Sequence, residues 1–421
     1  MPPFVELSAR SAFSLLAGAS TPESLAERAG RAGMPALALT DRFDLGGAVR
    51  FHRACREAGV RPVQGAEVLC PGLPPLVLLC ESRAGWRHLS ALVSRARLSS
   101  PRGEPTLDAS GLEGRTEGLL CLARGAASEP SEAPLRRLSA LFPGRLWVAL
   151  EHHGLPREGR RVAGWLEAAA GVGVPWVPVN APRYHRPSRR MVHDVLTCLR
   201  HDVTLDEAGD RLLPNGEWYL KSAEQMRMRW CDEALARTAG IAARCTFEVT
   251  DLEPRLPSYP VPGDRSSVAF LRELVDRGAA ERYGEDFAPR HRRQARHELE
   301  VIGRLGLADY FLIMWDVVRF AQRKRILVQG RGSAANSVVC YCLGITAVDP
   351  VGRDLLFERF LSEERGEAPD IDLDIAHDDR EEVLQYVYRR WGRDHAAMVC
   401  ETITYRGRMA VRDAARVLGF P

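Results

Sequence analysis

The sequence predicts an α/β protein with two folded regions joined by a Pro-rich linker. Residues 1–180 alternate apolar, strand-like runs with amphipathic helical stretches, and residues 190–250 have mainly helical patterns. Residues 251–266 contain four Pro and one Gly, a composition that favours a linker. Three helical stretches, a Gly-rich turn and an acidic strand follow. We therefore expect one domain at 1–250 and a second at 267–421.

The first domain is predicted to contain a parallel sheet, either open or closed into a barrel, because apolar strands alternate with helices. Thr21 and Pro22 predict where the first helix begins, with a capping hydroxyl followed by Pro at the first helical position. The expected strands are 35–40, 75–80, 118–122, 145–151 and 175–179, and the expected helices are 22–33, 46–59, 84–98, 131–142 and 157–172.

The second domain is predicted to begin with helices at 267–283, 289–305 and 309–324 and a short apolar strand at 326–328. A Gly-rich turn, a helix to about 342, an acidic strand, a helix at 378–392, a strand at 396–401 and a helix at 405–418 complete it. Its early helices carry a basic region that either follows a nucleic-acid backbone or is simply their solvated side. This region contains Arg290, Arg292, Arg293, Arg296, Arg319, Arg323, Lys324 and Arg325.

Size and composition are typical of a soluble globular protein with two or three domains. Of its 421 residues, 45% are hydrophobic and 27% are charged. No stretch approaches the roughly 18 apolar residues of a membrane span, and no secretory signal is visible, so a cytoplasmic location without membrane association is expected. The net charge of +3 gives no global nucleic-acid signature.

Cysteine and lysine usage restricts the chemistry further. The ten Cys form no Cys-x-x-Cys pair and no zinc-ligand spacing, which predicts reduced, mostly buried thiols. Of the 58 Lys and Arg residues, only Lys221 and Lys324 are Lys. Arg favours bidentate phosphate contacts, although a GC-rich genome explains the same bias.

Asp370, Asp372 and Asp374 alternate with apolar residues in the sequence Asp-Ile-Asp-Leu-Asp-Ile. In a strand, these carboxylates share one face and repel one another unless a cation lies among them. A divalent cation held by carboxylate oxygens is the usual compensation. The alternative is a half-exposed strand with a solvated acidic side.

Residues 330–333, Gly-Arg-Gly-Ser, form a turn suited to phosphate. Gly allows close backbone approach, Ser333 can cap the helix expected to begin there, and Arg331 offers a fork for phosphate oxygens. The turn matches neither a Walker A motif nor Gly-x-Gly-x-x-Gly, and a plain tight turn remains open. Its spacing from the aspartates suits neighbouring strands of one sheet. That arrangement predicts phosphoryl transfer with two metal ions.

Four segments carry a family resemblance. Residues 330–337, 340–350, 356–361 and 369–372 resemble the palm of the bacterial C-family polymerase III alpha subunit. Ala334-Ala335-Asn336-Ser337 and residues 362–367 resemble its error-prone, damage-tolerant branch. The resemblance implies a partial nucleotidyltransferase palm of the polymerase-beta type. It also implies a DNA-directed DNA polymerase that extends a primer-template with deoxynucleoside triphosphates.

By this resemblance, Asp370 and Asp372 would be the catalytic ligands of two Mg2+ ions, and Asp374 would have a supporting role. Gly332 and Ser333 would contact the incoming triphosphate, and Arg359 would reach its phosphates. Arg331 is assigned to nucleotide binding from its place in the turn. Without the family, Arg359 is one more surface residue on a helix expected at 352–361. A sliding clamp and mutagenesis accessory proteins would bind through regions downstream.

The N-terminal region resembles the polymerase-and-histidinol-phosphatase (PHP) domain, a distorted (β/α) barrel whose relatives bind metals through His and acidic residues. Here the motif positions read Ser8-Ala9-Arg10, Asp41-Arg42 and Ala181-Pro182-Arg183. Only Asp41 and Glu67 remain acidic, and Arg in ligand positions opposes a metal cluster. The site is therefore expected to be degenerate, with no PHP metal. His152, His153 and His185 are expected to be ordinary polar residues.

The family's third catalytic aspartate, fingers and DNA-gripping regions would lie beyond Pro421. The resemblance therefore predicts the N-terminal part of an error-prone polymerase, active in damage-induced mutagenesis and translesion synthesis, and a fragment that is inactive alone. Two alternatives remain open at this point. One is a phosphoesterase or exonuclease working through the barrel, and the other is a non-catalytic module that binds DNA or a partner.

Overall fold

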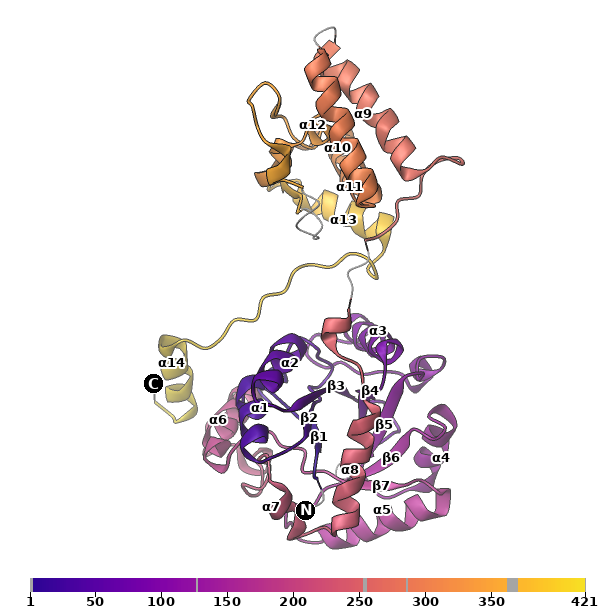
Figure 1. Cartoon of the computed structure of the whole chain (residues 1–421). Coiled ribbons are helices and arrows are strands. Elements are labelled where there is room, and N and C mark those ends of the chain that lie inside the picture. The colour runs from indigo at the N-terminus through magenta and orange to yellow at the C-terminus, as the bar shows by residue number, and fades with distance from the viewer. Residues whose placement is uncertain (1–2, 126–127, 253–255, 285–286, 362–369, 421) are drawn as a thin grey trace. The chain divides into compact units, whose positions relative to one another are not determined.

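The computed structural model describes residues 3–125, 128–252, 256–284, 287–361 and 370–420 (Figure 1). It divides into two compact units, one formed by residues 1–253 with 404–421 and the other by residues 254–403. The last residues therefore pack with the first unit, whereas the sequence had grouped them with the second. The predicted segment 362–367 lies outside the described residues.

The first unit is built on a seven-stranded sheet whose strands follow one another in chain order. Neighbouring strands are parallel except β4, which is antiparallel to both β3 and β5. The expectation of a purely parallel sheet is therefore wrong at β4, because residues 69–75 are too few for a crossover helix. The strands are β1 (Glu6–Ala9), β2 (Ala36–Leu39), β3 (Arg61–Val68), β4 (Leu76–Cys80), β5 (Leu119–Arg124), β6 (Leu146–Leu150) and β7 (Trp176–Pro178).

All five helices expected among these strands form, and Thr21 caps the first by accepting a hydrogen bond from the N–H of Ser24 at 3.3 Å. β1 and β3 are strands that the apolar patterns had not indicated. Residues 190–250 are helical only in part. The helices are α1 (Pro22–Arg31), α2 (Ala48–Glu57), α3 (Arg83–Ser99), α4 (Glu132–Leu141), α5 (Glu158–Val172), α6 (Arg190–His201), α7 (Ala223–Arg227) and α8 (Asp232–Arg244).

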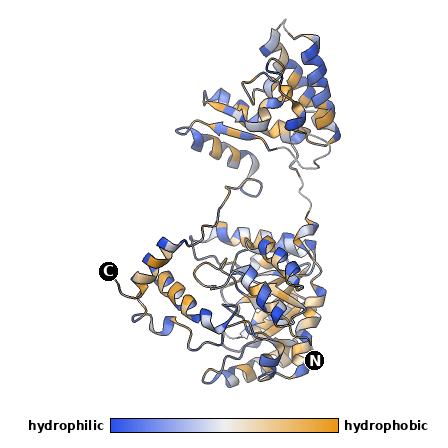
Figure 2. Ribbon diagram, turned by 60° about the vertical axis from the view of Figure 1, so that its left-hand side comes forward, coloured by the Kyte–Doolittle hydropathy of each residue, from blue (hydrophilic) through white to orange (hydrophobic). Residues whose placement is uncertain are grey.

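The sheet curls without closing, since the ladders of the described residues leave β1 and β7 as its two edges. Helix α8 packs against β7, β1 and β2, and the N–H of Val5 donates to the Thr238 hydroxyl at 2.9 Å (Figure 1). Apolar side chains of α8 join one core cluster with those of the strands, and the hydrophobic colour of Figure 2 follows the sheet. Helix α8 therefore closes the half-barrel by packing instead of by strand pairing.

The second unit joins three long helices to a two-stranded antiparallel sheet. Its elements are α9 (Ser267–Tyr283), α10 (Pro289–Arg304), α11 (Ala308–Arg323), β8 (Val328–Arg331), α12 (Val338–Cys342), β9 (Asp372–Ile375) and α13 (Arg380–Trp391). Helix α14 (Gly407–Val417) contacts α6. Two expectations are wrong: residues 396–401 form no strand, and the helix expected at 352–361 is a turn followed by a 3-10 helix, Phe357–Arg359.

Eight of the ten Cys are buried, Cys231 and Cys400 are exposed, and all ten are free thiols, which confirms the prediction from their spacing. No helix among the described residues is long and apolar enough to cross a membrane.

Gly278 of α9 allows α12 to pack backbone to backbone. A Cβ atom at this position would lie 1.9 Å from the carbonyl oxygen of Cys342, at the end of α12. The contact fixes the short helix that follows the Gly-rich turn, so the turn inherits its position from the packing of α9 and α12.

Gly278→Ala is expected to lower the free energy of unfolding by about 1–3 kcal/mol, because backbone must move to admit the methyl group. Gly303→Ala on α10 is the matched control. Its nearest neighbours would be side-chain atoms of Val268 at 3.7 Å, so the higher helix propensity of Ala should leave stability unchanged or raise it. Urea denaturation measures both variants, and equal effects would contradict the close approach.

Candidate functional site

The acidic strand lies directly beside the Gly-rich turn. β9 pairs antiparallel with β8, and the register places Asp372 opposite Arg331 and Asp374 opposite Gln329. Asp370, Asp372 and Asp374 are exposed, whereas the apolar residues between them are buried or half-buried. The predictions of neighbouring strands and of one acidic face are therefore confirmed.

Arg331 supplies positive charge to two of the three carboxylates. Its Nε lies 3.2 Å from Oδ1 of Asp374 and 3.8 Å from Oδ2 of Asp372, and all three side chains are more than half exposed. Exposed ion pairs of this kind contribute little to stability. The pairing holds the acidic face without burying it, so a stronger cation or an anion can replace either partner.

Ser333 and Tyr310 tie the turn and helix α11 to the segment that carries Asp370. The Ser333 hydroxyl donates to the backbone oxygen of Asp370 at 3.5 Å, and the N–H of Ile371 donates to the Tyr310 hydroxyl at 3.2 Å. Burial, together with the charges of Asp370 and Asp372, raises the pKa of Tyr310. Tyr310 therefore stays a neutral phenol beside the aspartates at neutral pH.

The two glycines of the turn serve different purposes. At Gly330, a Cβ atom would lie 2.6 Å from the carbonyl oxygen of Ile345, the group to which the Gly330 N–H donates. Gly332 has a φ of +67°, in the left-handed region that favours glycine, with open space where a Cβ would be. Gly330 thus allows close packing, and Gly332 allows the backbone to reverse.

The helix N-terminus expected at the turn is not there. Residues 332–336 form a short 3-10 helix, and α12 begins only at Val338. The N–H groups of Val338 and Val339 and the hydroxyl of Ser337 all donate to the carboxyl of Glu298, at 3.0, 3.0 and 2.7 Å. An internal carboxyl therefore occupies the positive end of α12, which removes it as a phosphate site.

Glu298 is fully buried on helix α10. Burial raises its pKa, the hydrogen bonds from Val339, Ser337 and Val338 oppose the shift, and the net value is about 6. The carboxyl group of Glu298 therefore gains or loses its proton near pH 6, although it lies inside the core.

Arg359 lies near the turn, but it donates no side-chain hydrogen bond within the described residues. The 3-10 helix Phe357–Arg359 contacts the 3-10 helix Gly332–Asn336, and the Arg359 side chain is exposed. The structure therefore brings the 3-10 helix that ends with Arg359 to the turn. Asp372 and Asp374 belong to the ladder with β8, and Asp370 precedes it.

Two residues of this region escaped sequence analysis. Tyr310 carries no motif and is found only by its contact. Glu298 had a signal, since it lies on the apolar stripe of α10 formed by Ala295, Leu299 and Ile302, where a charge is unusual.

In the first unit, several of the positions that the PHP resemblance singled out belong to a largely buried ion-pair cluster. Glu67 pairs with Arg10 and Arg124 and, at 3.3 Å, with the Nε of Arg42, while Arg124 also pairs with Glu151 at 2.6 Å. Burial would raise the pKa of Glu67, but the guanidinium groups of Arg10 and Arg124 lower it far below its ordinary value. Glu67 is therefore a permanent anion that neutralises arginines.

Asp41 anchors the loop that follows β1. Its carboxyl accepts hydrogen bonds from the N–H and hydroxyl groups of both Ser11 and Ser14, at distances between 2.6 and 3.1 Å. Oδ1 accepts three of these hydrogen bonds and Oδ2 accepts one, so both carboxyl oxygens are engaged by protein donors. Together with Arg10 beside Glu67, this donor set does not fit a metal cluster, and the described residues contain no group of three metal-ligating side chains.

The three histidines near this site make ordinary polar contacts. His153 is buried, stacks on Trp218 at 4.0 Å between ring centroids and bonds the backbone oxygen of Asn180 at 2.9 Å. His185 contacts the hydroxyl of Ser20 at 2.7 Å through Nδ1. His152 lies 3.5 Å from Glu158. These contacts give each ring a structural role.

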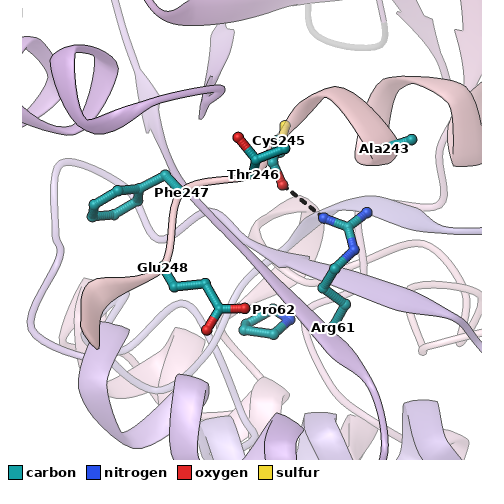
Figure 3. A pocket seen from close by; sticks show the side chains of 7 residues that line it. All are labelled: Arg61, Pro62, Ala243, Cys245, Thr246, Phe247 and Glu248. Carbon is teal, nitrogen blue, oxygen red and sulfur yellow. Dashed lines mark hydrogen bonds between the residues drawn. The ribbon is translucent and has the colours of Figure 1, made fainter. Parts of the chain in front are cut away.

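A small hollow elsewhere in this unit also has a structural explanation. Figure 3 shows Arg61 pointing toward the end of α8, where it donates to the backbone oxygens of Cys245 and Ala242, both at 2.6 Å. Cationic side chains stabilise the carbonyl end of a helix. Arg61 therefore caps α8 from β3, and its guanidinium is already engaged.

Comparison with known families now places both regions. Residues 6–166 match the PHP domain, and residues 269–421 match the bacterial DNA polymerase III alpha NTPase domain. Each of the two regions is therefore similar to one of these two families. Helix α14 lies within the polymerase III match, although it packs with the unit that carries the PHP match.

Curated relatives match along the whole chain. The error-prone DNA polymerase of Dechloromonas aromatica is 43% identical over 424 residues, which cover 100% of this chain and 41% of that protein. Those of Mycobacterium tuberculosis and Methylococcus capsulatus are also 43% identical and cover 99% of this chain and 40% of each protein. The chain thus spans about two-fifths of the length of these relatives.

Among solved structures, an amidohydrolase from Chromobacterium violaceum matches with a TM-score of 0.33 and 14% identity, over 42% of this chain and 86% of that one.

Glu67→Gln is expected to lower the free energy of unfolding by about 3–5 kcal/mol, because it leaves buried guanidinium groups without their shared anion. Glu23→Gln is the control, since Glu23 pairs with Arg50 on the surface and should contribute about 1 kcal/mol or less. Chemical denaturation measures both variants. A cost for Glu67→Gln as small as that of the control would show that the cluster does not depend on Glu67.

Glu298 predicts a pH-dependent stability that falls as pH rises. The pKa of Glu298 is about 6 in the folded protein and 4.5 in the ordinary group. Its contribution to the free energy of unfolding is therefore complete below pH 4.5 and is lost as the pH rises to 6. The unfolding free energy of the parent, minus that of Glu298→Gln, should fall by about 2 kcal/mol between these limits. Denaturation at pH 4, 5, 6 and 7 measures the difference. The exposed Glu300→Gln on the same helix is the control, and a constant difference for Glu298→Gln contradicts the prediction.

Proposed function

We propose that the second unit carries part of the nucleotidyl-transfer centre of an error-prone DNA-directed DNA polymerase. The supporting observation is the β8–β9 ladder, which places the Gly332-Ser333 turn beside Asp370 and Asp372. The relatives bear the name error-prone DNA polymerase. Primer-template DNA and deoxynucleoside triphosphates would be the substrates, and the role would be synthesis across damaged templates.

Asp370 and Asp372 fit Mg2+ as its ligands. Both are exposed carboxylates beside each other on the acidic face, and hard oxygen ligands are those that this cation prefers. Bound there, two such ions would polarise the phosphoryl group and activate the attacking hydroxyl. Asp374 would hold Arg331 in place, since it makes the shorter of the two ion pairs.

The turn would bind the triphosphate through side chains and reversed backbone. Arg331 offers a planar fork that suits phosphate oxygens, and its present carboxylate partners are weakly held at the surface. Ser333 would donate its hydroxyl, and Gly332 would permit close approach. Arg359 would reach the phosphates from the neighbouring 3-10 helix. Phosphate recognition would thus use guanidinium groups instead of a helix N-terminus.

The basic residues of α10, α11 and the turn after α11 would follow the DNA backbone, since Arg293, Arg296, Arg323 and Arg325 are exposed. Contacts with a sliding clamp or with mutagenesis accessory proteins, predicted from the resemblance, would use residues beyond those described.

Asp370→Asn combined with Asp372→Asn is expected to weaken Mn2+ binding to the chain by at least about 100-fold, because both carboxylate ligands are lost. Electron paramagnetic resonance of free Mn2+ measures the affinity directly. Asp394→Asn, which removes an exposed carboxylate elsewhere in the unit, is the control and should leave the affinity unchanged.

The same double substitution in a longer protein that carries this chain should abolish primer extension, whereas the Asp394→Asn control should retain it. Primer extension at the parental rate without Asp370 and Asp372 would refute the proposed function. Unchanged Mn2+ affinity would refute the ligand assignment by itself.

A further inference from the structure

A pocket of about 560 Å3 lies in the first unit where β1, β2 and β3 end. These three strands are parallel, so the segments after them meet at one edge of the sheet. Its walls come from residues 13–17 after β1, Arg42 after β2, Leu69 after β3, the loop 100–106 and Arg200 of α6. The pocket therefore adjoins the ion-pair cluster of the altered barrel site.

The pocket lining carries four arginines and one carboxylate. Arg42, Arg97, Arg102 and Arg200 line it together with Glu104. Among the described residues, the side chains of Arg102 and Arg200 have no hydrogen bond or ion pair. The lining thus has an excess of positive charge that the protein itself does not neutralise.

Of the other two arginines, one has a carboxylate of its own and one shares its carboxylate with two further arginines. Arg97 pairs with Asp44 at 2.6 Å, just outside the pocket. Arg42 pairs with Glu67, but that single carboxylate also serves Arg10 and Arg124.

Repulsion within this group is visible in the electrostatics of Arg42. Burial lowers the pKa of Arg42, Glu67 opposes the shift, and the charges of Arg10 and Arg200 lower it further. Deeper in the same region, burial and the charges of Arg10 and Arg124 lower the pKa of Arg183 to about 9, and its buried Nε has no hydrogen-bond partner. An anion in the pocket would relieve this repulsion.

Hydrogen bonds hold the loop 100–106 in one conformation at the side of the pocket. The Ser100 hydroxyl donates to the backbone oxygen of Thr106 at 3.1 Å and accepts from the Thr106 N–H at 3.0 Å, so the two ends of the loop are held together. The N–H of Leu107 donates to the oxygen of Leu69 at 2.9 Å, which fixes the loop to the end of β3. Arg102 is therefore presented from a closed loop, and little ordering is needed on binding.

We propose that this pocket binds a phosphate-class oxyanion, supplied either as free diphosphate or as phosphate groups of a nucleic-acid backbone. Guanidinium groups bind phosphate oxygens through paired, charge-assisted hydrogen bonds. The volume is within the range of small-ligand sites and exceeds the need of a single halide. This edge of the sheet would therefore bind an anion instead of a metal ion. The proposal does not depend on the function of the second unit.

The test uses the whole chain with two probes. Isothermal titration calorimetry measures inorganic pyrophosphate, and fluorescence anisotropy measures a labelled single-stranded oligonucleotide. Arg102→Ala combined with Arg200→Ala is expected to weaken binding of at least one probe by about tenfold or more, since charge-assisted hydrogen bonds are lost. Neither residue has a structural partner among the described residues, so the fold should persist, which circular dichroism checks.

Arg53→Ala combined with Arg160→Ala is the matched control. It removes the same charge from exposed positions on α2 and α5, outside the pocket, and should leave both affinities unchanged. If pyrophosphate binding depends on Arg102 and Arg200, the ligand of the pocket is free diphosphate. If only oligonucleotide binding depends on them, the ligand is the nucleic-acid backbone. Failure of the parent to bind either probe, or equal losses in both double variants, would overturn the proposal.

Discussion

The pairing of β8 with β9 is the contact on which the candidate polymerase site depends. The two strands have four residues each, and their inner apolar side chains pack on Val317, Phe320 and Val383 of α11 and α13. Because side chains alternate along a strand, seating Leu373 and Ile375 inward leaves Asp372 and Asp374 outward. The acidic face is therefore a consequence of the register, and a slip by one residue would bury the carboxylates.

A second constraint comes from below the turn, where Glu298 occupies the N-terminal end of α12. A helix end that already holds a carboxyl attracts no further anion, so this site has no use for the helix dipole. The groups of the turn that can still bind phosphate are the exposed ones. They are Arg331, Ser333 and the backbone that reverses direction at Gly332. Buried contacts hold the part of the turn that faces the core, whereas the side chains that face solvent can still change their partners.

Much of this could be predicted from sequence because it rests on local patterns. Helix α9 begins and ends where its periodicity indicates, and the alternation from Asp370 to Ile375 predicts the acidic face correctly. Sequence patterns predicted the structure wrongly where an element depends on residues that are distant in the chain. The direction of β4 follows from a loop too short for a helix, and the strand expected at 396–401 lacks a neighbouring strand among the described residues. Glu298 and Tyr310 gain their roles from residues about 40 and 60 positions away in the chain.

The packing of α14 on α6 makes the second unit an insertion within the first. The chain leaves the first unit near residue 253 and returns at residue 404, where the oxygen of Val417 accepts from the N–H of Leu205 at 2.9 Å. A ribosome synthesises the sheet, α6 and α8 long before α14, so the partner surface on α6 must wait while residues 254–403 are made. During that interval, Cys198 and Ala208 lack the apolar contact of Val417. Completion of the first unit therefore cannot precede synthesis of residues 254–403, although most of its residues are made before them.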